Sequence, residues 1–106
     1  MNATTANLID EIKKIVSAII EKDITTVSGF SERQLEAISK QTLIIKGGIA
    51  TGDIDDDLID FFLEGLHAMT TNFVNTLKGI LKVVLEKVWN AVISVLYQAI
   101  GILGFN

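Results

Sequence analysis

An apolar repeat of eleven residues runs through the second half of the chain, and no proline interrupts the sequence anywhere. An eleven-residue period corresponds to about 3.67 residues per turn, which keeps an apolar stripe on one side of a nearly straight α-helix. The repeat therefore predicts helical structure. Its rows are Phe62, Phe73, Val84 and Val95; Leu66, Leu77, Val88 and Ala99; and Met69, Ile80, Ala91 and Ile102.

The repeat keeps its phase across the two glycines that could end a helix. Gly65 and Gly79 each cost about 1 kcal/mol relative to alanine in a helix interior, but neither precedes a capping residue or a polar loop. Asp53 is a suitable N-cap, and the acidic residues after it favour the positive end of the helix dipole. We therefore predict one long helix from Asp53 to Leu103.

The first half of the chain predicts two shorter helices. Asn7 can cap the first helix, whose apolar residues recur at helical spacing, and this helix should end near Lys22. Residues 23–29 are predicted to form a connector. Ser31 and Gln34 have the spacing of a capping box, so a second helix should begin at Glu32, and Gly52 should end it. The predicted fold is all-α, with a helical hairpin at 1–52 and the long helix at 53–106 in a single structural unit.

Charge and composition exclude several function classes. The 106 residues include no cysteine, which excludes disulfides and thiolate metal sites. The net charge of −4 is unevenly distributed, with −6 over residues 1–64 and +2 over residues 65–106. Because no basic cluster is present, nucleic acid is not an expected partner. The N-terminus lacks the pattern of a cleaved secretory signal, so synthesis in the cytoplasm is expected.

The length of the predicted helix implies a partner. A helix over residues 53–103 would extend roughly 75 Å, whereas a compact chain of this size has a radius of gyration of about 13 Å. The two short helices cannot cover such a rod, so its apolar side predicts a homo-oligomeric helical bundle. The predicted oligomer or membrane interface consists of Phe62, Leu66, Met69, Phe73, Leu77, Ile80, Leu81, Val84, Leu85, Val88, Trp89, Val92, Val95, Leu96, Ala99, Ile102 and Leu103.

A lipid bilayer is the alternative partner, because residues 88–105 carry no charge. In that interpretation the protein is a pore, an anchor or a lysis factor, and Trp89 lies at the membrane interface beside Lys78, Lys82 and Lys87, which stay on the cytoplasmic side. The segment is near the short limit for crossing about 30 Å of hydrocarbon, and it contains the amides Asn90 and Gln98. A soluble bundle is therefore favoured over insertion.

The residues that could carry chemistry do not assemble into a recognisable motif. Asp53, Asp55, Asp57 and Glu64 match ligand positions of a calcium-binding loop, but Leu58 occupies the position that requires glycine. His67 is the single histidine, and a lone histidine is usually a surface or interface residue. The sequence therefore predicts a non-enzymatic protein with no metal, no other cofactor and no small-molecule substrate.

One family resemblance bears on the biological context. The segments 65–69 (GLHAM), 72–77 (NFVNTL) and 86–92 (EKVWNAV) resemble small uncharacterised helical proteins of tailed-phage and prophage gene clusters, over roughly Phe30 to Ile100. The resemblance implies a virion or phage-assembly setting, in which other virion proteins are possible partners. It implies no activity and no functional residues.

Overall fold

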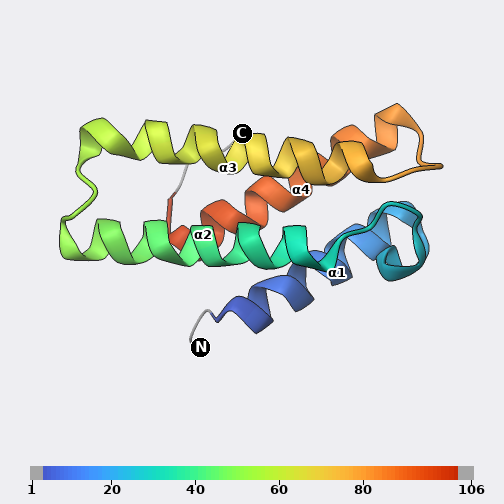
Figure 1. Ribbon diagram of the computed structural model, residues 1–106, viewed down its shortest axis with the longest axis horizontal. Coiled ribbons are helices and arrows are strands. Elements are labelled where there is room, and N and C mark those ends of the chain that lie inside the picture. The colour runs from blue at the N-terminus through green and yellow to red at the C-terminus, as the bar shows by residue number, and fades with distance from the viewer. Residues whose placement is uncertain (1–3, 103–106) are drawn as a thin grey trace.

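The computed structural model describes residues 4–102, and in this range the chain forms an all-helical fold without strands. Four α-helices follow one another: α1 Thr5–Ile20, α2 Glu32–Thr51, α3 Asp56–Thr76 and α4 Lys82–Ile100. A short 3₁₀ turn, η1 Ile24–Thr26, lies between α1 and α2. Figure 1 shows α2 and α3 as an antiparallel pair, with α4 inclined across them and α1 packed along α4.

Local capping signals set most of the helix ends. The Ser31 hydroxyl accepts a hydrogen bond from the Gln34 amide at 3.2 Å, and Gly52 ends α2 in the left-handed conformation. Both ends of α2 thus confirm the prediction. At α1, however, the cap predicted at Asn7 is wrong. Thr4 is the N-cap, and its hydroxyl accepts a hydrogen bond from the Asn7 amide. At α3 the N-cap is Asp55 rather than Asp53, whose carboxylate instead accepts the Thr51 hydroxyl.

The prediction of one helix from Asp53 to Leu103 is wrong over the described residues. The helix ends at Thr76, the backbone at Leu77 is extended, and Gly79 adopts a φ of +77° before α4 begins. The chain therefore reverses at residues 77–81, and α3 and α4 pack against each other. Leu103, the predicted end of the rod, lies outside the described residues.

A contact from the first half of the chain accounts for the break. The amide of Lys78 donates to the carbonyl of Ser28 at 2.9 Å, which is a bond that a continuing helix would not allow. Beside it, Gly29 has a φ of +90° and lies so close to Thr76 that a Cβ on Gly29 would be 1.8 Å from the Thr76 carbonyl oxygen. Only glycine fits this approach, so the connector between α1 and α2 holds the end of α3.

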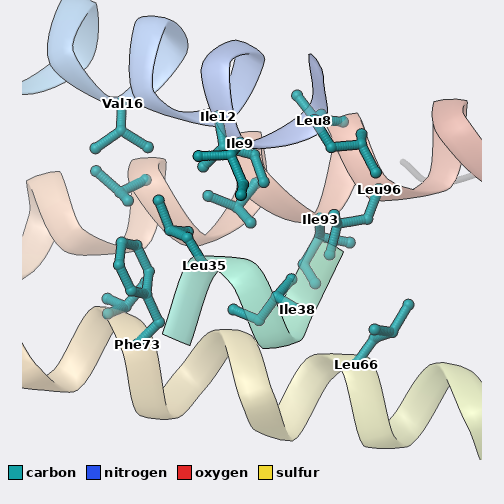
Figure 2. Packing of buried hydrophobic residues seen from close by; sticks show 14 of the residues in the cluster. Leu8, Ile9, Ile12, Val16, Leu35, Ile38, Leu66, Phe73, Ile93 and Leu96 are labelled. Atoms are coloured by element: carbon teal, nitrogen blue, oxygen red, sulfur yellow. The ribbon is translucent and has the colours of Figure 1, made fainter. Parts of the chain in front are cut away.

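The core is formed by all four helices of one chain. Figure 2 shows Leu8, Leu35, Phe73 and Ile93 among the labelled side chains that converge there from α1, α2, α3 and α4. The radius of gyration is 13.6 Å, close to the roughly 13 Å of a compact chain of this length. The bundle therefore covers most of the predicted apolar stripe internally, and the length argument for a partner no longer applies.

One buried polar group in α2 offers a stability test. Ser39 is fully buried, and its hydroxyl has no hydrogen-bond partner among the described residues. Thr42 and Thr70, by contrast, donate to the carbonyls of Ile38 and Leu66 one turn earlier.

Replacing Ser39 by alanine should therefore raise the free energy of unfolding by about 1 kcal/mol, because an unsatisfied hydroxyl costs free energy in the core. Urea denaturation measures the change. Thr42→Val is the matched control, since it removes a bonded hydroxyl and should give no such gain. A loss of stability in Ser39→Ala would show that the hydroxyl is satisfied in the folded protein.

Candidate interaction surfaces

An open groove runs between α2 and α3 on the surface of the bundle. Its larger part has a volume of about 380 Å³ and is lined by Gln41, Phe61, Phe62, Glu64, Gly65 and Met69. A second part of about 200 Å³ shares Met69 and is otherwise lined by Gln34, Ala37, Ile38 and Asn72. Glu64 is the single charged residue in the two linings. The groove is therefore apolar and amide-lined along much of α2 and α3.

Large apolar side chains project beside this groove. Phe61 is 68% exposed, and its ring meets that of Phe62 edge to face with centroids 5.6 Å apart. Ile44 on α2 and Leu58 on α3 are also exposed and lie three residues along their helices from the groove residues Gln41 and Phe61. We call these three residues together with the groove the α2–α3 face.

Gly65 lies in the α2–α3 face without an intramolecular packing role. A Cβ at this position would meet nothing within 4 Å, although glycine costs about 1 kcal/mol relative to alanine inside a helix. The folded monomer therefore gives no reason for glycine at residue 65. A close approach by another backbone would give one.

The principal polar cluster lies between α3 and α4. Nε2 of His67 and the hydroxyl of Tyr97 share a hydrogen bond of 2.8 Å, and their rings stack with centroids 5.9 Å apart. Trp89 meets His67 edge to face and donates its indole N–H to the Thr71 hydroxyl at 3.1 Å. Because these residues are far apart in sequence, their contacts exist only through the reversal at Gly79.

This cluster has the features of a helix-packing contact. Partial burial, with the negative charge of Asp60 as a smaller cause, raises the pKa of Tyr97 above its ordinary value, so the phenol stays protonated at neutral pH. None of the described grooves combines His67 and Tyr97 in its lining. The cluster therefore joins α3 to α4, and its members Thr71 and Trp89 also line an open groove of about 180 Å³.

The acidic residues that match ligand positions of a calcium-binding loop are spread over the α2–α3 connection and α3. Asp55 caps α3, Asp57 is exposed in its first turn, and Glu64 lies at the groove. Among residues 4–102 no group of three or more histidine, aspartate or glutamate side chains is placed to hold a metal ion.

A second apolar surface lies at the turn that joins α3 to α4. Leu81 is 73% exposed and Val83 58% exposed, where α4 begins. A groove of about 200 Å³ beside them is lined by Ile19, Ile20, Glu21, Lys22, Gly79, Ile80, Leu81 and Val84. We call residues 77–87 the α3–α4 corner. Figure 1 shows this corner at the same end as the α1–α2 connection and far from the α2–α3 connection.

The structure separates the predicted interface residues into three groups. Leu81 is exposed, and Phe62, Met69, Ile80, Val84, Leu85, Trp89, Ala99 and Ile102 are partly buried. The remaining described residues of the set lie in the core of a single chain: Leu66, Phe73, Leu77, Val88, Val92, Val95 and Leu96. The sequence prediction missed Ile44, Leu58 and Phe61, which fall outside the main apolar stripe.

Helix α4, which carries charges only in its first turns, satisfies the length and composition of a membrane span. Its mean hydropathy is 1.3 over the best window, and a third of that window is buried in the bundle. The core helix of a soluble protein has the same properties, so this observation is weak evidence for insertion. In the structure α4 packs against α1, α2 and α3.

The chain was compared with family models, curated proteins and solved structures, and none of the three comparisons found a match.

Proposed function

We propose that this protein is a non-enzymatic assembly protein that forms a homo-oligomer through the α2–α3 face. The observation that carries the proposal is the position of Phe61, an exposed aromatic side chain beside a groove of about 380 Å³ on the same face. In a two-fold dimer the same patch of both copies meets, so each projection faces the partner's groove. Phe61 of one copy then fills the groove of the other.

The size of the face supports a dimer. Helices α2 and α3 contain 20 and 21 residues, which corresponds to about 30 Å each, and packed neighbours lie about 8–10 Å apart. The pair thus presents an area of the same order as the roughly 800 Å² that each partner buries in a standard interface. The accessible surface of the whole chain is 6374 Å², so such an interface would cover about one eighth of it.

The charges at the borders of the face also favour a second copy. The exposed charges of α2 sum to +1, with Arg33, Lys40 and Lys46 against Glu32 and Glu36, whereas α3 carries only acids among its lysine, arginine, aspartate and glutamate positions: Asp56, Asp57, Asp60 and Glu64. When α2 of one copy lies over α3 of the other, opposite charges come together at the rim. Gly65 would allow the close approach of the partner backbone.

Sedimentation equilibrium tests the proposal. We expect the wild-type chain to self-associate, and Phe61→Ser to weaken association at least tenfold, because a central aromatic anchor typically contributes 2 kcal/mol or more. Val83→Ser removes an exposed apolar side chain from the other end of the molecule and should associate like wild type. A wild-type chain that stays monomeric at its highest soluble concentration, with helical circular dichroism intact, would contradict the proposal.

The phage setting remains a prediction from the sequence resemblance. A self-associating helical protein suits a virion or assembly role, and the partners would then include other virion proteins. The proposed dimerisation does not depend on this setting, since the exposed Phe61 and the groove between α2 and α3 are what support it.

A further inference from the structure

The α3–α4 corner combines exposed apolar side chains with positive charge. Leu81 and Val83 are exposed, and Lys78 and Lys82 lie beside them in the chain and are exposed too. Lys87 lies one helical turn after Val83, so the two share one side of α4. Residues 77–87 contain these three lysines and a single acid, Glu86.

The opposite end of the molecule is acidic. Asp53, Asp55, Asp56 and Asp57 are exposed in the connection between α2 and α3 and in the first turn of α3, and Asp60 follows them. The corner lies at the other end of the long axis in Figure 1, and that axis measures 42 Å. Glu21 and Lys22 line the groove beside the corner, and the exposed Asp23 follows them in the α1–α2 connection. The chain as a whole carries −4, and the positive excess at this end belongs to residues 77–87.

We propose that the α3–α4 corner docks on a bilayer surface rich in anionic phospholipid. Leu81 and Val83 enter the headgroup layer, the lysines of the corner contact lipid phosphates, and the acidic end points away from the membrane. Charge complementarity selects this occupant: juxtamembrane lysines are attracted to an anionic leaflet, and apolar side chains add burial at the headgroup boundary. The bundle remains folded, since α4 keeps its place in the core.

This docking differs from insertion of α4. Val88, Val92 and Leu96 are fully buried against the other helices, so spanning the bilayer would require the bundle to open. Docking through the corner uses side chains that are already exposed. It is also independent of the α2–α3 face, because Phe61 belongs to a different surface.

Co-flotation with liposomes tests the proposal with the full chain. We expect the protein to float with vesicles of phosphatidylglycerol and phosphatidylcholine and to stay at the bottom with phosphatidylcholine alone. Leu81→Ser combined with Val83→Ser should reduce binding at least tenfold, since both apolar contacts are lost. Lys78→Gln and Lys82→Gln should each reduce it about fivefold.

Phe61→Ser is the matched control, because it removes an equally exposed apolar side chain outside the corner and should float like wild type. All substituted side chains are exposed, and circular dichroism verifies that each variant stays folded. Failure of the wild type to float with anionic vesicles would overturn the proposal. Undiminished flotation of the variant with both Leu81→Ser and Val83→Ser would also overturn it. Loss of self-association in that variant would overturn it too, because the corner would then be an interface between protein chains.

Discussion

Replacing Phe73 by alanine is expected to lower the free energy of unfolding by about 3–5 kcal/mol, the usual cost of removing a fully buried aromatic side chain. Phe73 is completely buried in α3, and its ring meets that of Phe30 edge to face with centroids 6.1 Å apart. Phe30 precedes α2, so the substitution also weakens the contact between the two halves of the chain. Urea denaturation followed by circular dichroism measures the change.

Phe61→Ala is the control for Phe73→Ala, because the same atoms are removed from a side chain that is 68% exposed. At protein concentrations too low for association, its effect should stay within about 0.5 kcal/mol, as for ordinary surface substitutions. If Phe73→Ala fails to fold, Phe73→Leu provides a milder change of the same sign. Equal effects at residues 61 and 73 would contradict the burial described for α3.

Replacing Gly29 by alanine is expected to cost at least 2 kcal/mol, for two reasons. The φ of +90° is unfavourable for any residue with a Cβ, by roughly 1–2 kcal/mol, and the added Cβ would overlap the backbone carbonyl of Thr76. Because a carbonyl at a helix end cannot move as a flexible side chain does, the overlap displaces α3 from the connector. Thermal or urea denaturation gives the loss of stability.

Gly52→Ala separates the two causes. Gly52 has a similar φ of +81°, but a Cβ there would meet nothing within 4 Å. It should therefore show only the conformational cost of roughly 1–2 kcal/mol. A Gly29→Ala variant no less stable than Gly52→Ala would mean that the connector does not press against the end of α3.

Helix ends encoded by neighbouring residues were predictable from the sequence. Ser31 and Gln34 lie three residues apart, so the start of α2 needed no tertiary information, and Gly52 marked its end in the same way. The all-helical class followed from the spacing of apolar residues. These features depend on residues that are close together in the sequence, so they can be predicted without knowing the tertiary structure.

The reversal at Gly79 was not predictable in this way, because the group that holds the end of α3 is the carbonyl of Ser28 in the first half of the chain. The continuous phase of the repeat also led to the wrong prediction of a single helix from Asp53 to Leu103. In an antiparallel hairpin α3 and α4 both turn an apolar stripe to the same core, so Phe73 and Val95 are both buried whether or not a turn separates them. Periodicity records burial and not connectivity.

The candidate surfaces were partly accessible from sequence. Leu81 belonged to the predicted interface and is exposed at the corner, while Phe61 was missed because it lies next to Phe62 and outside the repeat. An aromatic residue outside the apolar stripe of an amphipathic helix was the available signal. The contact between His67 and Tyr97 had no signal at all, since it depends on the reversal.

The most direct test of the account measures the distance between Ala68 and Gln98 within one chain. Both are exposed neighbours of the His67–Tyr97 contact, and the absence of native cysteine allows Ala68→Cys and Gln98→Cys to be spin-labelled cleanly. Dilution with unlabelled protein removes distances between copies. The folded-back hairpin predicts a separation within about two helix diameters, roughly 20–25 Å. A separation of about 45 Å, as in one continuous helix, would contradict the four-helix bundle.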